Sequence, residues 1–274
     1  NPRKLRLIYE NDRKRDRADA EYLARVGRMD PTLLAPVSHR GEQVQADRAL
    51  FRARDQLVRI RTRLVSHVRG AVKSWGERLP SSSTMAFPGK VAEHIPEPLR
   101  PGLMPIVEQI DDLNARIKDF DQQIERLCEE RYPETEVLRQ VEGVGPKCAL
   151  FYVLTIEDPT RFRTSRSVGP YLGLVPRQDD SGETERRGRI TKKGDDLCRR
   201  LLVQSAHYIL GPFGTDSDLR RWGKRLDEES GQGGRKRAAV AVARKLAVLL
   251  HRLWITGDEY DPLYQAREEE ADAA

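Results

Sequence analysis

Two long stretches of the chain repeat apolar residues at alternating steps of four and three, and this repeat limits the possible folds more than any other feature. The first stretch, Glu42 to Trp75, carries Ala46, Leu50, Ala53, Leu57, Ile60, Leu64, His67 and Ala71 at these steps. The second carries Ile106, Ile110, Leu113, Ile117, Phe120, Ile124 and Leu127. This rhythm is typical of a coiled-coil seam. We therefore predict two long helices.

The segment between the two helices, Leu79 to Gly102, is rich in Pro, Ser and Gly and is too irregular to continue either helix. Helices joined in this way fold back on each other as an antiparallel hairpin, or they pair with the helices of another subunit. A helix of about thirty residues is about 45 Å long. The hairpin is therefore expected to project from a compact domain or to bridge between two domains.

Shorter elements are predicted on both sides of the hairpin. Residues 4–9 alternate charged and apolar residues as a strand does, and residues 16–26 have the pattern of a helix. Beyond Pro133 a compact domain follows, with helices near 195–210 and 235–254. The predicted parts are residues 1–40, the hairpin 41–132, the helical domain 133–262 and a disordered acidic tail 263–274. The fold class is mainly α, with a small β content (α+β).

Composition and charge favour a soluble protein with a polyanionic partner. Charged residues make up 34% of the 274 residues, well above the roughly 25% of an average domain. The net charge is +6 and the pI is near 9.3, which suggests contact with nucleic acid. Three widely spaced cysteines, Cys128, Cys148 and Cys198, indicate reduced, buried thiols rather than a zinc site. No apolar run reaches the ~18 residues of a membrane span, so a cytoplasmic location is expected.

The first long helix carries much of the basic surplus. It holds eight Lys or Arg residues against three acids, and arginine forms the better fork for phosphate oxygens. We select Arg52, Arg59 and Arg63 as candidate nucleic-acid contacts. The other interpretation is the ordinary charged exterior of a coiled coil.

The stretch VEGVGP at 141–146, followed by an apolar helical run, has the pattern of a helix-hairpin-helix element. In such an element Gly143 and Gly145 let backbone N–H groups approach a phosphate at a helix N-terminus, and Lys147 adds charge. A plain tight turn between two helices is the alternative.

Ser181 lies between Asp180 and Gly182 at what the sequence predicts to be the tip of a β-hairpin. A serine in a turn is usually only a turn residue. This one precedes a dense basic cluster that could hold a phosphate, composed of Arg186, Arg187, Arg189, Lys192 and Lys193. A nucleophilic serine is therefore the second interpretation.

Asp16 and Asp19 stand three residues apart at the start of the predicted N-terminal helix. At this spacing both carboxylates share one face, and hard oxygen ligands so arranged suit Mg²⁺. Two carboxylates do not complete a magnesium site, so further ligands would have to come from elsewhere. Acids are also favoured in a first helical turn by the helix dipole alone.

Four of these stretches together resemble a known family. They are KRDRADAEYLARVGRMDP, VEGVGP, GPYLGLVPRQDDSG and GRITKKGDDLCRRLLVQSA, and in this order and spacing they look like the transposases of the insertion sequence 110 family. The likeness covers nearly all of the chain. The combination is far more specific than any single stretch.

The resemblance implies a RuvC-like domain of the RNase H fold, of which residues 1–40 would be the C-terminal remnant, then a coiled-coil hairpin and a transposase domain. Asp16 and Asp19 would be the third and fourth acids of an Asp-Glu-Asp-Asp site for Mg²⁺, and the first two acids are expected before Asn1. Ser181 would attack DNA and form a phosphoserine intermediate. The implied partners are the DNA of the insertion sequence and its target, a structured guide RNA and further copies of the chain, as a dimer or tetramer in the bacterial nucleoid.

One departure from the family pattern is that Glu183 stands where a further glycine commonly follows Ser-Gly. The rival function is a non-catalytic, basic coiled-coil protein that binds DNA or RNA. In that case the two aspartates and the serine would be ordinary surface residues.

Overall fold

The computed structural model of the chain describes residues 15–34, 39–181, 184–231, 233–264 and 267. The chain divides into two compact units, residues 1–45 and residues 46–274. The described part is mainly helical and has a single two-stranded antiparallel sheet. The predicted mainly α fold with a short β-hairpin is therefore confirmed at this level.

The first unit contains the helix α2 (Asp16–Met29) and the short 3-10 helix η2 (Pro31–Leu34). Two acids in its first turn and Arg28 in its last turn suit the helix dipole at both ends. Pro31 follows directly after the C-cap residue Asp30, which suits the end of a helix. The predicted strand at residues 4–9 lies outside the described residues.

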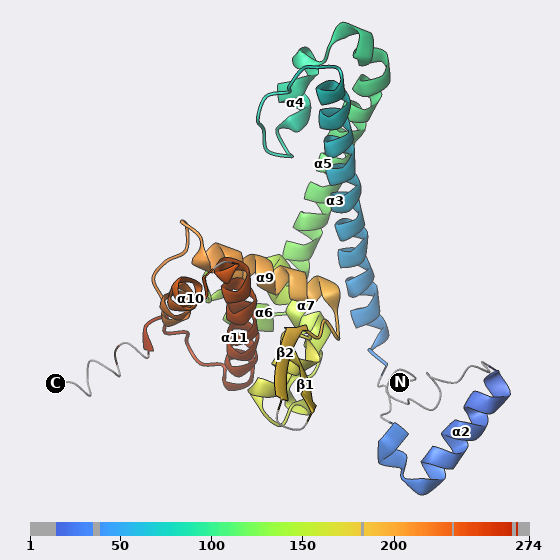
Figure 1. Ribbon diagram of the computed structural model, residues 1–274, viewed down its shortest axis with the longest axis vertical. Coiled ribbons are helices and arrows are strands. Elements are labelled where there is room, and N and C mark those ends of the chain that lie inside the picture. Colours follow the sequence, from blue (N-terminus) through green and yellow to red (C-terminus); the bar gives the residue numbers. More distant parts are fainter. Residues whose placement is uncertain (1–14, 35–38, 182–183, 232, 265–266, 268–274) are drawn as a thin grey trace. The chain divides into compact units, whose positions relative to one another are not determined.

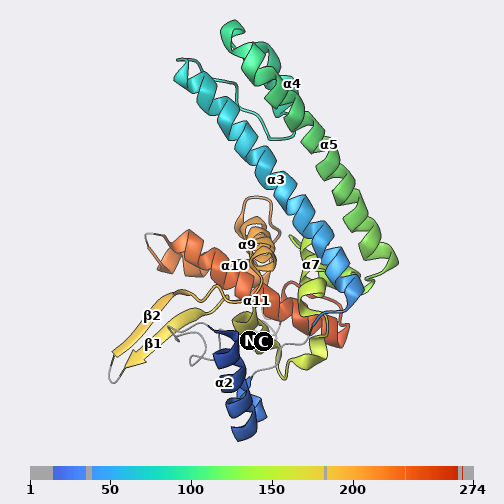
Figure 2. The same ribbon diagram turned by 90° about the vertical axis from the view of Figure 1, so that its right-hand side faces the viewer.

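The two long predicted helices are present as α3 (Glu42–Ser74) and α5 (Arg100–Glu130), which lie side by side in Figures 1 and 2. Their polar contacts show that they run antiparallel. The Arg54 guanidinium donates to Asp121, at 2.6 Å from its Nε to Oδ1, and Arg61 donates to Asn114 at 2.8 Å. The residue later in α3 contacts the residue earlier in α5, as expected for antiparallel helices.

The side of α3 that faces α5 differs from the predicted seam. On α5 four of the seven predicted seam residues, Ile110, Leu113, Ile117 and Ile124, are buried, and the other three, Ile106, Phe120 and Leu127, are half-buried. On α3 the buried apolar residues are Phe51, Val68 and Val72, one position after the predicted Leu50, His67 and Ala71. The physical reason is that Arg54 and Arg61 lie on the side of α3 that faces α5, where each has a polar partner. The predicted seam residues therefore lie to one side of this contact.

The connection between the long helices is more ordered than its composition suggests. It forms α4 (Phe87–Val91), η3 (Ala92–His94) and η4 (Glu97–Leu99). Phe87, Val91 and Ile95 form a buried cluster with apolar residues from the ends of α3 and α5. The tip of the hairpin therefore has a small hydrophobic core of its own.

The C-terminal helical domain packs around α7, whose residues from Cys148 to Ile156 are all buried. Its elements are α6 (Glu134–Arg139), α7 (Pro146–Ile156), η5 (Pro159–Arg161), η6 (Ser165–Ser167), α8 (Val168–Tyr171), β1 (Pro176–Ser181), β2 (Thr184–Ile190), α9 (Asp196–Leu210), α10 (Asp218–Glu229) and α11 (Gly234–Thr256). The small residues Ala238, Ala239 and Ala243 of α11 are fully buried, which allows its close approach to the neighbouring helices. The helix α10, which the sequence analysis did not foresee, packs against α11.

None of the helices in the described ranges is both long and apolar enough to span a bilayer. The three cysteines are free and buried, as predicted. Burial raises the pKa of the Cys148 thiol to about 11, so this group stays protonated near neutrality.

Candidate nucleic-acid and catalytic site

The two predicted metal ligands, Asp16 and Asp19, both lie in the first turn of α2, where their spacing puts them on one face. The oxygen Oδ1 of Asp19 is buried and accepts no hydrogen bond in the described structure. A buried carboxylate oxygen without a partner costs free energy, and a bound cation would offset that cost. The two carboxylates therefore fit Mg²⁺, although no cluster of three or more candidate ligands occurs among the described residues.

Ser181 is the last residue of β1, and its backbone pairs with Thr184, the first residue of β2. The predicted β-hairpin is thus present, and Ser181 stands at its tip. The strands pair further back through Asp179 with Arg186 and Gln178 with Arg187. For residues 178–181 and 184–187 only the backbone is described.

The basic cluster leads from this hairpin into the helical domain. Arg189, Lys192 and Lys193 are all exposed. The backbone of this loop packs directly against Gly173. A Cβ atom at residue 173 would lie only 2.2 Å from the Lys193 carbonyl oxygen. Gly173 also has a φ of +70°, so glycine is needed there on both counts.

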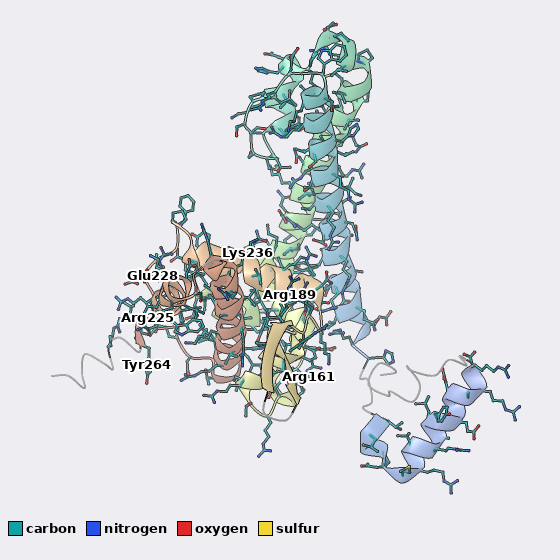
Figure 3. The ribbon with its side chains drawn as sticks, in the orientation of Figure 1. Arg161, Arg189, Arg225, Glu228, Lys236 and Tyr264 are labelled. Carbon is teal, nitrogen blue, oxygen red and sulfur yellow. The ribbon has the colours of Figure 1, made fainter. Side chains whose placement is uncertain are left out.

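A groove of 1620 Å³ lies beside this loop, between β2, α10 and the outer face of α11. Its floor is apolar and includes Leu219, Trp222, Val240 and Val248. Basic residues outnumber acids in its lining: besides Arg189 and Lys192 it includes Arg166, Lys236, Arg237, Arg244, Lys245 and Arg252, against Asp218, Asp258, Glu259 and Asp261. Figure 3 labels Arg189 on β2 and Lys236 in the first turn of α11.

The sequence analysis missed the basic residues of α11. A signal was present, because Arg237, Arg244 and Arg252 recur at steps of seven and eight and therefore lie near one face of the helix. The Lys245 ammonium lies 3.9 Å from the centre of the Trp222 ring. Burial, and then the nearby Arg225, lower the pKa of Lys245.

Two of the three arginines selected on α3 make ion pairs within the chain. Arg52 lies 2.8 Å from Asp195, and Arg59 lies 2.9 Å from Asp55. Arg63 is exposed. Only Arg63 of the three therefore has no ion-pair partner among the described residues, while Arg52 helps to dock α3 on the N-terminus of α9.

Asp195 is the centre of this docking contact. Its side chain caps α9 by accepting from the N–H groups of Leu197 and Cys198, and it also accepts from the guanidinium of Arg48 at 2.5 Å. Burial acts to raise its pKa, but the Cys198 N–H and the positive charges of Arg48 and Arg52 outweigh burial and hold the pKa below its ordinary value. Asp195 is therefore a charged, nearly buried N-cap.

The VEGVGP turn joins α6 to α7 as predicted, but its two glycines have different surroundings. Gly143 has a φ of +88° and packs against α9, where an added Cβ atom would lie 3.0 Å from Tyr208 and 3.1 Å from Ile209. Gly145 is the N-cap of α7, has a φ of −83° and has open space beside it. Lys147 is 3.3 Å from Asp121 of α5. Of the two glycines, only Gly145 is open for an approaching phosphate.

This difference gives a testable prediction for the turn. Gly143→Ala is expected to destabilise the protein by about 1–3 kcal/mol, because it combines a left-handed φ with a crowded Cβ position. Gly145→Ala is the matched control and should change the free energy of unfolding by less than about 1 kcal/mol. Urea unfolding of both variants measures this. Equal losses would mean that the packing of Gly143 on α9 does not matter.

Comparison with known proteins gives consistent matches along the chain. Residues 135–213 match the model described as "Transposase IS116/IS110/IS902 family", and residues 1–75 match a DEDD-type model for IS110 elements described as "Transposase". A "Probable family 20 transposase" of Pseudomonas aeruginosa is 32% identical over 253 residues, which are 89% of this chain and 73% of that protein.

Two further relatives carry similar descriptions. The "Transposase for insertion sequence element IS1111A" of Coxiella burnetii is 27% identical, over 92% of this chain and 70% of that protein. The "Transposase for insertion sequence element IS1328" of Yersinia enterocolitica is 28% identical, over 77% of this chain and 63% of that protein. The matches therefore extend over both units of the chain.

Proposed function

The chain belongs to the IS116/IS110/IS902 family of transposases, and from this premise we propose that it recombines insertion-sequence DNA by serine attack at Ser181. Transposases of this kind are DNA-acting enzymes. The observation that supports the serine is its position at the tip of a β-hairpin, from which a basic loop leads to the groove. The N-terminal match to a DEDD-type model supports a divalent metal at Asp16 and Asp19.

In the proposed reaction the Ser181 hydroxyl attacks a DNA phosphorus in line with the leaving sugar oxygen. The serine O–P bond forms as the P–O bond to that sugar breaks; the serine proton passes to solvent or a basic group, and the leaving oxygen takes up a proton. Attack by another strand's hydroxyl on the phosphoserine then releases the serine. The phosphoester bond is retained throughout, so strands are exchanged without an external energy source.

Asp16 and Asp19 would hold Mg²⁺ together with the two further acids that the family pattern places earlier in sequence. Bound Mg²⁺ supplies charge stabilisation for the phosphate oxygens and the leaving group. The two carboxylates contribute hard oxygen ligands from one helical face, and the unpartnered Oδ1 of Asp19 is the described atom that most favours this role. No other described acid is assigned to the site.

Nucleic acid is proposed to lie along the basic groove of α11 and the loop after β2. The candidate contacts are Arg189, Lys192 and Lys193, with Arg186 and Arg187 nearby in sequence. The open helix start at Gly145 is a separate candidate. We propose that these surfaces bind both the DNA and a structured guide RNA. We also propose a homo-oligomer, a dimer or tetramer, in which metal ligands and serine from different copies can meet at one phosphate.

The covalent intermediate tests this function directly. The chain in its complete natural form is incubated with Mg²⁺, the RNA of its element and end-labelled element DNA, and the products are separated under denaturing conditions. A DNA-linked peptide that contains Ser181, identified by mass spectrometry and absent without Mg²⁺, is the expected result. DNA binding without any protein-linked DNA would favour the non-catalytic binding protein instead.

The groove is tested by the salt dependence of binding. A variant in which Arg189, Lys236 and Arg252 are changed to Ala should bind single-stranded DNA with a weaker salt dependence. The negative slope of log association constant against log salt should become less steep by about 2, since each phosphate contact contributes about 0.7. The control changes Lys224, Arg225 and Arg235 to Ala, an equal loss of charge outside the groove. Equal effects of the two variants on the slope would show that only net charge matters.

A further inference from the structure

The groove beside α11 carries a surplus of positive charge. Eight basic side chains line it against four acidic ones, which leaves an excess of four. The bases on α11 stand at three levels, at Lys236 and Arg237, at Arg244 and Lys245, and at Arg252. With a rise of about 1.5 Å per residue, these levels are about 11–12 Å apart along the helix. A surplus spread in this way attracts an extended anionic segment.

The chain itself contains such a segment. Residues 268–274 have the sequence EEEADAA and carry no base, and we name them the acidic tail. Its acids are Glu268, Glu269, Glu270 and Asp272, so its four negative side chains equal in number the positive surplus of the groove. The other three residues are alanines, which are small enough to lie against the apolar floor. Charge and composition therefore both suit the groove.

The chain just before the acidic tail is attached to the wall of the groove. Asp218, Asp261 and Pro262 all line the groove. The Asp218 N–H donates to the Pro262 carbonyl at 2.8 Å. The guanidinium of Arg267, the residue directly before the acidic tail, lies 3.0 Å from the Asp261 carboxylate. The acidic tail therefore starts at the groove.

This attachment lies at the end of the groove near Arg252. Four residues, 230–233, separate α10 from α11, and the two packed helices therefore run antiparallel. Asp218, the first residue of α10, is thus close to the C-terminal end of α11. Seven extended residues span about 23–25 Å. Arg252 and Arg237 are about 22 Å apart along α11, so the acidic tail is long enough to follow all three levels of bases.

We infer that the acidic tail lies along this groove and covers it until nucleic acid displaces it. The inference rests on the proposed function, because it takes the groove as the nucleic-acid site. Carboxylates of the tail take the places of phosphates beside the same basic side chains, so the groove holds one or the other. Because the tail is part of the chain, its effective concentration at the groove is about millimolar. Nucleic acid with few phosphate contacts is therefore excluded, whereas nucleic acid with many contacts displaces the tail.

Cross-linking of the full chain tests where the acidic tail lies. A carbodiimide joins a carboxylate to a lysine amine that it contacts, without adding a spacer. At low salt we expect links from the tail to Lys236 or Lys245, identified by mass spectrometry, and their loss at high salt or with saturating DNA. Lys224 is the matched control, because it is exposed on α10 but does not line the groove. No links to the groove lysines, or equally frequent links to Lys224, would overturn the inference.

The affinity for DNA measures the competition. The tail variant combines Glu268→Gln, Glu269→Gln, Glu270→Gln and Asp272→Asn. If the tail covers the groove in about nine of ten molecules, this variant should bind a DNA oligonucleotide about tenfold more tightly at low salt. The gain should disappear at high salt, where the wild-type tail no longer holds.

A second variant controls for net charge. It neutralises four exposed carboxylates of α5, which do not line the groove, and so changes the net charge of the chain by the same amount. The changes are Glu108→Gln, Asp111→Asn, Asp112→Asn and Asp119→Asn. Its DNA affinity should stay within about twofold of the wild-type value, since these charges are many Debye lengths or helical turns from the groove in the chain's own contacts.

Each outcome decides for or against the covered groove. Links to the groove lysines together with tighter binding by the tail variant alone would support it. Equal gains for the tail variant and the α5 variant would overturn it, because net charge alone would explain them. Links to the groove lysines with unchanged DNA affinity would overturn the competition and would place the DNA elsewhere, which the salt slope of the groove variant tests separately. The DNA-linked peptide reports on the serine chemistry and depends on none of these outcomes.

Discussion

Ser181→Ala is expected to abolish the DNA-linked species and to lower recombination by at least about 10⁴-fold, because no other group replaces an enzyme's covalent nucleophile. Binding of DNA should stay within about twofold, since one hydroxyl contributes little to a contact dominated by phosphate charge. Gel analysis of protein-linked DNA and a transposition assay measure the two effects. The prediction is therefore a loss of chemistry with retention of binding.

Thr184→Ala is the matched control for Ser181→Ala. Thr184 pairs with Ser181 across the hairpin and also carries a hydroxyl group. Its loss should leave the DNA-linked species in place and change the rate only modestly. If Ser181→Ala kept the linked species, or if both variants lost activity equally, Ser181 would not be the nucleophile and the hairpin would matter only for its shape.

Asp195→Ala is expected to destabilise the protein by about 3–5 kcal/mol. It removes the N-cap of α9 and leaves the guanidinium of Arg48, whose side chain is only 9% exposed, without its carboxylate. Arg52 adds little to this loss because its side chain is 54% exposed. Thermal unfolding should show a fall in Tm of about 10 °C.

Asp196→Ala is the control for Asp195→Ala. Asp196 is the next residue, its side chain is 57% exposed, and its ion pairs with Arg59 and Arg200 are long, at 3.8 and 3.7 Å. Its removal should cost less than about 1 kcal/mol. If the two variants unfolded at the same temperature, the contact between α3 and α9 would not depend on Asp195.

The pH dependence of stability should follow from the same carboxylate. The pKa of Asp195 is below its ordinary value of 3.8 in the folded protein. Its contribution is therefore complete above about pH 4 and is lost as the pH falls through the lower folded value. The wild-type chain should lose stability more steeply than Asp195→Ala in this acidic range. Parallel curves for the two proteins would contradict the assignment.

Much of the fold was predictable because it depends on local sequence. The helices α2, α3, α5, α9 and α11 follow from apolar periodicity, and the turn at 141–146 and the hairpin tip near Ser181 follow from glycine placement. The candidate metal pair was visible for the same reason, since spacing alone places Asp16 and Asp19 on one helical face. These features need no knowledge of what lies across space from each residue.

The sequence by itself therefore determined α2, α3, α5, α9 and α11, the β-hairpin and the family, because periodic patterns and ordered motifs are properties of neighbouring residues. Tertiary structure alone decided which side of α3 faces α5, since Arg54 and Arg61 find their partners on another helix. It also decided that Gly143 packs on α9, that Arg52 pairs with Asp195, and that the bases of α11 border a groove. The physical reason is that a charge or a glycine has its role set by the group opposite it, and that group can lie more than a hundred residues away in the chain.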